Sequence, residues 1–194
     1  MQTERSVLVL VMSDKKEKVL ETATKLFAEL GFEKTSMALI CKEAKVSKGL
    51  VYHHFESKKS ILIEIFTSST HKMIESNVNI NDTIEPKGEL KQLINNVFYQ
   101  LENDKLFFQF NLNIMFQPST RSLLEAHIKE RADILFKSVK RIFDKISLDR
   151  SEILTYTLLA EIDGIALNYL SVFDDYPLQM IKAELLNKYN KIKK

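Results

Sequence analysis

Residues 35–59 read TSMALICKEAKVSKGLVYHHFESKK, and this stretch decides the fold. Thr35 or Ser36 can serve as the N-cap of a short helix, and Ser47 as the N-cap of a second helix after a turn at Lys45. Two short helices joined by a tight turn predict a helix-turn-helix. Apolar residues at helical spacing give each helix an inward face, namely Met37, Ile40, Cys41 and Ala44 in the first and Leu50, Val51 and Phe55 in the second.

The opposite face of this stretch is basic and aromatic. Lys48, Tyr52, His53 and Lys58 are expected to face outward, where their donors suit a DNA phosphate. Residues 41–59 hold five lysines against two glutamates, whereas residues 81–194 balance sixteen basic with sixteen acidic residues. The positive charge is therefore concentrated at the motif. A solvated lysine-rich surface is the alternative that charge alone leaves open.

A wider pattern of residues surrounds the motif: Leu30-Gly31-Phe32, Thr35-Ser36, Ile40, Ala44, Val46-Ser47-Lys48-Gly49, Tyr52, His54-Phe55 and Ser57-Lys58. This pattern, over residues 13–65, resembles the DNA-binding domain of the tetracycline-repressor (TetR-like) family. Over the rest of the chain the resemblance is in length and helix count only. It implies an all-α, dimeric, ligand-responsive regulator without identifying the ligand.

The resemblance implies that the start of the second motif helix enters the major groove of DNA. Lys48 is the expected base reader, Gly49 allows close approach of the backbone, and Leu50 touches a thymine methyl. The other expected DNA contacts are Thr35, Ser36, Met37, Lys45, Ser47, Tyr52, His53, His54 and Lys58. For Tyr52, the alternative is that its ring is half-buried in the core and does not contact DNA. Adjacent residues lie on different helix faces, so only one of the two histidines is expected to meet DNA.

Lys45 departs from the family pattern, which usually has glycine at this turn position. Such positions often need a positive φ, which costs a non-glycine residue about 1 kcal/mol. The sequence therefore predicts either a slightly altered turn or a lysine that contacts a phosphate.

The composition of the 194 residues predicts an all-α globular protein. Hydrophobic residues make up 45% of the chain, and glycine and proline are scarce. The net charge of +2 does not by itself indicate a nucleic-acid binder. The single cysteine, Cys41, cannot form an internal disulfide, which suits a reducing cytoplasm. Zinc, nucleotide-binding and nucleophile signatures are missing, so we expect no metal, no cofactor and no enzymatic activity.

The first helix is predicted from Asp14 to Leu30, with Asp14 and Glu17 as a capping-box pair and Gly31 as the C-terminal cap. Residues 1–12 are expected to be a flexible or extension segment. Their apolar run at 7–11 is too short to span a bilayer. An arm beside the DNA is the alternative.

Residues 13–60 are expected to form the DNA-binding domain, and a fourth helix at 57–78 links it to the rest. A loop within 77–88 precedes the second domain, residues 79–194, which serves effector binding and dimerisation. Its apolar stripes predict helices over about 90–101, 106–116, 119–146, 149–173 and 177–192, or about nine helices in all. Asp149 and Glu152 are expected to cap the 149–173 helix, and Pro177 to begin the last one.

The last two helices are predicted to form a four-helix interface in a homodimer. The 149–173 helix is apolar almost all round, and such a helix is buried on more than one side. The expected interface residues are Leu158, Ile162, Ile165, Tyr169, Met180, Ile181, Leu185 and Tyr189. The alternative is that both helices close the core of a single chain.

The aromatic segment at 106–116 predicts a pocket for a small, mostly apolar molecule. Polar residues set into apolar helix faces are candidates to orient that molecule. The expected lining is Phe108, Asn111, Met115, His127, Tyr156, Glu161, Asp163 and Asn168. Phenylalanines at helical spacing are also typical of plain core, which is the alternative.

The sequence therefore predicts a homodimeric repressor that binds a palindromic operator in double-stranded DNA and is released by an unknown effector. A TetR-like activator and a helical protein-interaction module without specific DNA binding are the alternatives. Steep salt dependence of DNA binding distinguishes the regulator from the module. No membrane partner is expected.

Overall fold

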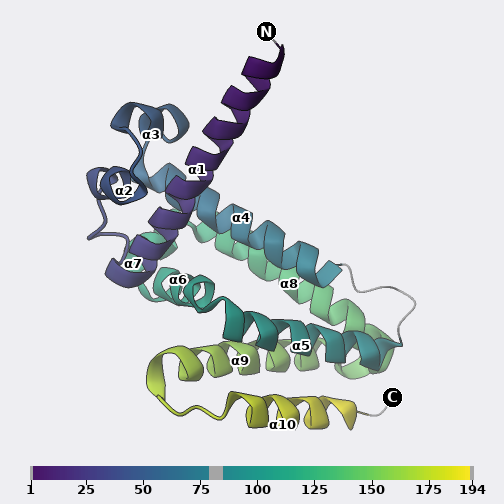
Figure 1. The fold of residues 1–194 in the computed structure, drawn as a ribbon. Coiled ribbons are helices and arrows are strands. Elements are labelled where there is room, and N and C mark those ends of the chain that lie inside the picture. The colour runs from purple at the N-terminus through teal and green to yellow at the C-terminus, as the bar shows by residue number, and fades with distance from the viewer. Residues whose placement is uncertain (1, 79–84, 193–194) are drawn as a thin grey trace. The chain divides into compact units, whose positions relative to one another are not determined.

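The computed structural model describes residues 2–78 and 85–192, with side chains for 14–74 and 85–192. These residues are mostly helical and contain no strand (Figure 1). The α-helices are α1 (Gln2–Leu30), α2 (Met37–Ala44), α3 (Lys48–His54), α4 (Lys58–Val78), α5 (Pro86–Asn103), α6 (Lys105–Phe116), α7 (Pro118–Leu123), α8 (Glu125–Ile146), α9 (Ser151–Leu167) and α10 (Leu178–Asn190). A 3-10 turn (Leu148–Arg150) precedes α9, and a π-helical turn (Asn168–Val172) extends it. None of the described helices is long and apolar enough to cross a membrane.

The predicted 119–146 helix is divided, which gives ten α-helices in the described residues instead of about nine. Pro118 occupies the first turn of α7, where its missing N–H is not needed. Leu124 leaves the helical conformation (φ −109°, ψ 9°) between α7 and α8, and its side chain is fully buried. The apolar periodicity continues across this break, so the pattern alone did not reveal it.

The predicted capping box of Asp149 and Glu152 does not form. Asp149 lies in the 3-10 turn, where its carboxylate accepts a hydrogen bond from the Ser147 hydroxyl at 3.0 Å. Arg150 is instead the N-cap residue of α9, and no side chain caps this helix. The 3-10 turn therefore replaces the capping box as the entry into α9.

Helix α1 begins earlier than predicted. It is helical from Gln2, so Asp14 lies inside the helix and not at its N-cap. The C-terminal end follows the prediction: Gly31 has a φ of +84°, and its amide donates to the Phe27 carbonyl at 3.2 Å. This left-handed conformation accounts for glycine at the end of α1.

The chain divides into two compact units. The N-terminal unit holds the residues up to 69 together with 109–125, and the C-terminal unit holds 70–78, 85–108 and 126–192. Helices α4 and α6 each contribute residues to both units. The sequence assigns 109–125 to the second domain, whereas this segment packs with the first. Most of the predicted loop, residues 79–84, lies outside the described residues.

The core of the N-terminal unit is built from one face of each helix of the motif and its flanks. Its central members are Val19, Ala23, Leu26 and Phe27 of α1, Ile40, Cys41 and Ala44 of α2, Val51 of α3, and Ile61, Leu62, Ile65 and Phe66 of α4. The expected inward residues Met37 and Leu50 are only half-buried. Ser57 and Ser60 close the start of α4, because each amide donates to the other's hydroxyl oxygen, at 3.1 and 3.2 Å.

The core of the C-terminal unit joins α5, α8, α9 and α10. Four residues of the predicted dimer interface belong to it: Leu158, Ile165, Leu185 and Tyr189. These four are buried within one chain and contribute to its own core, so they leave little surface for a partner, and the dimer interface stays a prediction. Met180 is 72% exposed, whereas Ile162, Tyr169 and Ile181 are half-buried.

Candidate nucleic-acid interface

Two serine caps define the helix-turn-helix. The Ser36 hydroxyl oxygen accepts a hydrogen bond from the Leu39 amide at 3.1 Å, at the start of α2. The Ser47 hydroxyl oxygen accepts from the Leu50 amide at 3.4 Å, at the start of α3. Both caps agree with the sequence prediction, and each satisfies an amide that the helix itself leaves without a partner.

The turn between α2 and α3 has the backbone geometry that the family pattern requires, with lysine in place of glycine. Lys45 has φ 55° and ψ 41°, and it is the one non-glycine residue with positive φ in the described part of the chain. Its amide donates to the Lys42 carbonyl at 3.1 Å, and the Val46 amide donates to the Cys41 carbonyl at 3.1 Å. The turn is therefore not altered. The lysine adopts a conformation that costs a non-glycine residue about 1 kcal/mol.

Four residues from the turn into α3 are exposed: Lys45, Ser47, Lys48 and Gly49. A Cβ placed on Gly49 would meet no atom within 4 Å, so the fold itself does not require glycine there. Tyr52 and His53 are exposed further along α3, with the tyrosine 53% exposed, which excludes the alternative of a half-buried core ring. Ser36, at the start of α2, is also exposed.

Thr35 does not belong to this exposed surface. It is only 1% exposed, and its hydroxyl donates to the Gly31 carbonyl at 2.9 Å, with the Leu26 carbonyl at 3.3 Å. The side chain therefore joins the end of α1 to the start of α2. A direct phosphate contact by Thr35 is incompatible with this burial.

Lys58 is also bound within the unit. Its ammonium donates to the Phe32 carbonyl at 2.6 Å and lies 4.2 Å from the centre of the Phe32 ring. Burial lowers the pKa of Lys58 below its usual range. This lysine thus joins the start of α4 to the loop after α1, which makes it a poor candidate for a mobile phosphate contact.

The two histidines of α3 point to different faces, as their adjacency predicts. His53 is exposed, whereas His54 is half-buried and its buried Nε2 has no hydrogen-bond partner among the described residues. Burial lowers the pKa of His54, and the charges of His53 and Lys16 lower it further. Of the pair, His53 is therefore the residue available to DNA.

The exposed lysines outside the predicted contacts include Lys34 and Lys42. Lys34 lies just before the Ser36 cap, and Lys42 lies in the last turn of α2. Lys34 could have been predicted as a DNA contact, because it is a cation two residues before an N-cap serine. The exposed surface of Ser36, Lys45, Ser47, Lys48, Gly49, Tyr52 and His53, flanked by these two lysines, is called the basic face below.

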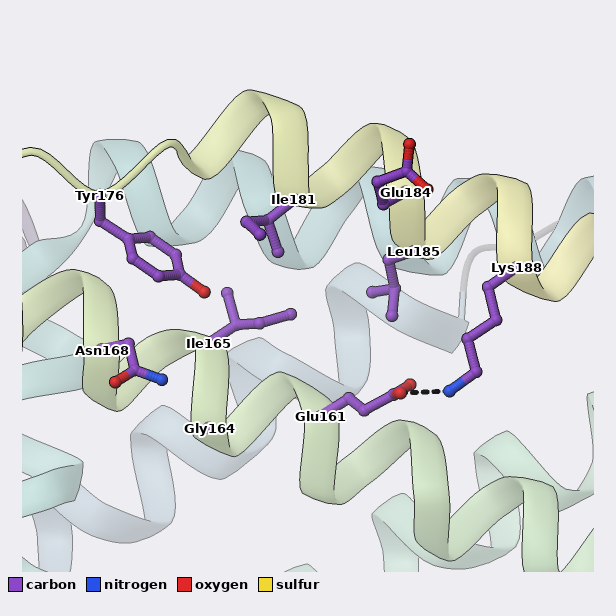
Figure 2. A pocket seen from close by; sticks show the side chains of 9 residues that line it. All are labelled: Glu161, Gly164, Ile165, Asn168, Tyr176, Ile181, Glu184, Leu185 and Lys188. Carbon is purple, nitrogen blue, oxygen red and sulfur yellow. Dashed lines mark hydrogen bonds and ion pairs between the residues drawn. The ribbon is translucent and has the colours of Figure 1, made fainter.

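The residues of the predicted ligand pocket come from both units: Asn111 and Met115 belong to the N-terminal unit and the other six to the C-terminal unit. Met115, Tyr156 and Asp163 are exposed, and Phe108, Asn111 and His127 are half-buried. Two others, Glu161 and Asn168, line an open groove of about 470 Å³ between α9 and α10 (Figure 2).

The groove between α9 and α10 contains an ion pair. Glu161 of α9 pairs with Lys188 of α10, as Figure 2 shows, and accepts a hydrogen bond from the Tyr189 hydroxyl at 2.8 Å. Burial, followed by this contact with the carboxylate, raises the pKa of Tyr189 well above its usual range. Gly164 lies on the α9 wall of the groove, with no atom within 4 Å of the position of a Cβ.

Comparison with known proteins agrees with this arrangement. Residues 19–65 match the family described as "Bacterial regulatory proteins, tetR family". The chain is 29% identical over 163 residues to the uncharacterised HTH-type transcriptional regulator YuxN of Bacillus subtilis, covering 82% of this chain and 55% of YuxN. It is 28% identical to the regulator YhgD of the same organism, covering 78% of this chain and 70% of YhgD. The match thus spans about half the length of YuxN.

Solved structures share the fold. A transcriptional regulator from Rhodococcus sp. RHA1 superposes with a TM-score of 0.78 at 20% identity, covering 91% of this chain and 95% of that one. The fatty acid degradation regulator FadR from Bacillus halodurans superposes with a TM-score of 0.74 at 18% identity, covering 89% and 93%. Residues 19–65 are therefore similar to the DNA-binding segment of the tetR family of bacterial regulatory proteins, and the chain as a whole is similar to HTH-type transcriptional regulators in sequence and has the fold of the solved regulators.

Proposed function

We propose that this chain is a homodimeric repressor that binds a palindromic operator and is released by a small-molecule effector. The observation that best supports specific DNA binding is the exposed start of α3. Lys48 and Gly49 are exposed there, and a Cβ on Gly49 would meet no atom within 4 Å, directly after a turn that carries a second exposed lysine, Lys45. A glycine that the fold does not require is explained by close approach of another molecule.

Within the basic face, Lys48 is positioned to read a base and its neighbours to bind phosphates. A lysine at the leading turn of a recognition helix can donate to the O6 and N7 atoms of guanine. Ser36, Tyr52 and His53 are exposed donors on the flanks. Phosphate contacts fix the register of the protein on DNA, whereas base contacts give specificity.

The proposed dimer uses the outer faces of α9 and α10. Met180 is 72% exposed, and Ile162, Tyr169 and Ile181 are half-buried, so apolar surface remains for a partner chain. Gly164 leaves room for close approach of a partner helix along the groove. Met180→Lys would place a charge on this surface, and we expect it to shift the protein toward monomer in sedimentation analysis. Unchanged sedimentation would argue against this interface.

The proposed release mechanism is a shift between two populations. The dimer binds its operator when the two recognition helices lie roughly 34–36 Å apart, and an effector stabilises a different spacing. The C-terminal unit is the expected effector site, and α4 and α6 continue from it into the N-terminal unit. A cytoplasmic location follows from this function. An activator with the same domains would differ in the sign of the effect on transcription.

The test is binding of the purified full chain to fragments of its own upstream DNA, titrated with salt in the presence of random competitor. We expect tight binding to one palindromic fragment, with affinity that falls steeply as salt displaces lysine–phosphate contacts. Binding no tighter than to random DNA on every fragment, with no small molecule bound to the protein by mass spectrometry, would favour the interaction module instead.

A further inference from the structure

The loop between α1 and α2 is held by hydrogen bonds that meet at one backbone oxygen. The Phe32 carbonyl accepts from the Lys58 ammonium at 2.6 Å and from the Thr35 amide at 3.3 Å. Lys58 is the first residue of α4 and lies 26 positions further along the chain. This carbonyl therefore joins the start of α4 to a turn formed by residues 32–35.

The Phe32 side chain strengthens the same contact. Its ring is 7% exposed and packs against the Phe27 ring, with 5.3 Å between the centroids. The Lys58 ammonium lies 4.2 Å from the centre of the Phe32 ring, so it contacts both the carbonyl and the ring of one residue. To reach a phosphate, Lys58 would have to give up a charge-assisted hydrogen bond and a cation–π contact.

Thr35 holds the other end of the turn. Its side chain is buried, and its hydroxyl donates to the Gly31 carbonyl at 2.9 Å. Lys34 and Ser36, the residues on either side of Thr35, are exposed. The backbone is thus fixed on both sides of Lys34, while the side chain of this lysine remains exposed.

Two exposed side chains of this segment can donate to a phosphate. Lys34 carries an ammonium group. The Ser36 hydroxyl oxygen accepts from the Leu39 amide, and its O–H can still donate to another group. A donor on a fixed backbone loses less conformational freedom on binding than a donor on a mobile loop, so holding this turn favours contacts with DNA.

We propose that Lys58 is a positioning residue for DNA binding, which holds the turn of residues 32–35 through the Phe32 carbonyl. The turn held in this way presents Lys34 and Ser36 to the phosphates of the DNA backbone. Lys58 itself contacts no phosphate. Its contribution is independent of DNA sequence, because phosphate contacts position a protein without reading bases. This inference rests on the proposed DNA-binding function.

The competing interpretation is that the Lys58 ammonium leaves Phe32 and contacts a phosphate directly. A direct contact releases its own counterion, so the losses from removing Lys34 and Lys58 are additive. A positioning residue acts through Lys34, so removing Lys34 has little further effect once Lys58 is gone. The coupling between the two lysines therefore separates the two interpretations.

The experiment measures binding of the purified full chain to a short duplex of random sequence by fluorescence anisotropy, over a range of salt concentrations. The proteins are wild type, Lys34→Met, Lys58→Met and the double variant. We expect Lys34→Met to weaken binding about fivefold per bound protomer at roughly 0.15 M salt, and to lower the slope of log affinity against log salt by about one. Lys58→Met should weaken binding at least as much, and the double variant should bind like Lys58→Met.

Lys59→Met is the matched control, because Lys59 is the exposed neighbour of Lys58 at the start of α4. The Phe32 carbonyl is bound by Lys58 and not by this neighbour. The effects of Lys59→Met and Lys34→Met should therefore be additive, whatever the size of the first. Circular dichroism at the temperature of the binding assay checks that every variant is folded.

Hydrogen exchange of the free protein tests the contact without DNA. The Thr35 amide donates to the Phe32 carbonyl, so we expect Lys58→Met to speed its exchange about threefold or more, because the turn opens more often. The Val46 amide, which donates to the Cys41 carbonyl in the next turn, should exchange at an unchanged rate. Lys59→Met should leave both rates as they are in wild type.

Three results would overturn the inference: additive losses in the double variant, unchanged DNA affinity of folded Lys58→Met protein, or an unchanged exchange rate of the Thr35 amide. If wild-type protein binds DNA with steep salt dependence and any of these results is found, the positioning role fails while the proposed DNA-binding function stands. Wild-type protein that binds neither the random duplex nor its own upstream DNA would overturn both.

Discussion

The side-chain amide of Asn113 in α6 donates a hydrogen bond of 2.7 Å to the backbone carbonyl of Ala28 in the last turns of α1. The two residues are 85 positions apart in sequence and belong to the same compact unit. A carbonyl near a helix end has few partners within the helix, so a side-chain donor from elsewhere satisfies it. The bond fixes α6 to the helix that supports the helix-turn-helix.

Asn113→Ala should lower the free energy of unfolding by about 1 kcal/mol, because a partly buried hydrogen bond is lost. Urea denaturation measures this change. Asn103→Ala is the matched control, because the Asn103 amide donates to the Tyr99 carbonyl one turn away, on an exposed surface. We expect the control to change stability by less than about 0.5 kcal/mol. Equal effects of the two substitutions would mean that the long-range bond has no special role.

Two glycines of the N-terminal unit should respond to alanine in opposite ways. Gly31→Ala forces a side chain into a φ of +84° and brings its Cβ to 2.9 Å from the Gln117 side chain, so we expect a loss of about 1–2 kcal/mol. Gly49→Ala enters open space in a helix and should stabilise the protein by up to about 1 kcal/mol. Thermal unfolding tests both changes.

The same Gly49→Ala protein should bind its operator more weakly, because the added methyl group obstructs approach of the α3 backbone to DNA. Fluorescence anisotropy with an operator fragment measures this affinity. A variant that is more stable and binds DNA as tightly as wild type would show that the open space at Gly49 is not occupied by DNA.

Lys48 and Tyr52 should contribute to DNA binding in different ways. Lys48→Ala should weaken operator binding by ~1–3 kcal/mol and random DNA much less, if the lysine reads a base. Tyr52→Phe removes a phosphate donor and should weaken binding to all sequences alike. Competition assays with operator and random fragments distinguish these effects. Equal loss on both kinds of DNA in the lysine variant would remove its base-reading role.

Lys45 combines a strained backbone with an exposed charge. Lys45→Gly should raise the free energy of unfolding by up to about 1 kcal/mol, because glycine adopts φ 55° without strain. If the lysine contacts a phosphate, the same substitution should reduce the slope of log affinity against log salt by about 1. An unchanged slope, with improved stability, would show that the side chain does not contact DNA.

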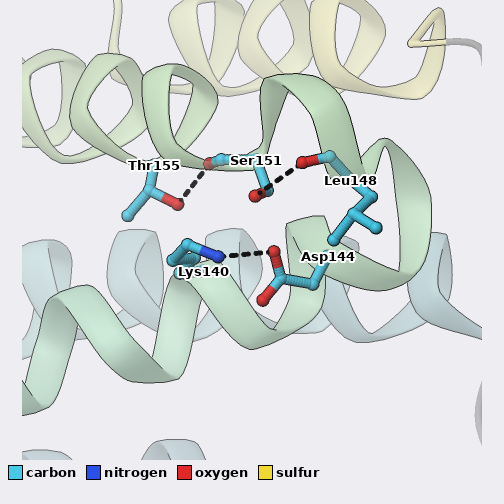
Figure 3. A network of polar contacts seen from close by, with 5 residues as sticks. All are labelled: Lys140, Asp144, Leu148, Ser151 and Thr155. Carbon is cyan, nitrogen blue, oxygen red and sulfur yellow. Dashed lines mark hydrogen bonds and ion pairs between the residues drawn. The ribbon is translucent and has the colours of Figure 1, made fainter.

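Asp144 of α8 makes stability depend on acid pH. The ammonium of Lys140, whose hydrogen bond to the Asp144 carboxylate is 2.7 Å long (Figure 3), is the largest cause that lowers the pKa of Asp144 below its usual value, and the nearby Ser151 hydroxyl lowers it further. The unfolded chain has the higher pKa, about 4, so the stabilisation is complete above that pH and is lost as the pH falls through the folded-state pKa. Asp144→Asn should therefore be less stable than wild type at pH 7, and the difference should shrink as the pH falls below about 4 and through the folded-state pKa.

Urea unfolding across this pH range measures the Asp144 contribution. Lys140→Met should remove much of the pH dependence, because it deletes the donor with the largest effect on the aspartate. A difference in stability between wild type and Asp144→Asn that does not shrink as the pH falls below about 4 would point to packing and not to charge.

The local features of the motif were predictable from sequence because their causes are local. Ser36 and Ser47 cap the helices that follow them within three residues, and Lys45 occupies a turn whose hydrogen bonds run to the preceding helix. Gly31 ends α1 for the same kind of reason. Propensity and capping rules operate over this range, so they succeed here.

Features that depend on distant parts of the chain were not predictable. Thr35 and Lys58 look like phosphate donors in sequence, but carbonyls at the end of α1 and in the loop after it take their hydrogen bonds. The burial of Arg131 was also not predicted from the sequence, because both its burial and its hydrogen bond to Thr70 result from packing between helices. A periodic pattern does not say which polar residue on a helix is removed from solvent.

Helices α6 and α7 complete the unit that carries the helix-turn-helix, although they lie some distance beyond it in sequence. Phe110, Ile114 and Leu124 are each almost fully buried there. The DNA-binding unit is therefore complete only after residue 125 has been synthesised. Its first helices leave the ribosome before the segment that completes their core. An N-terminal fragment that stops after α4 would lack these apolar groups, so grafting the helix-turn-helix onto another protein requires the segment 109–125 as well.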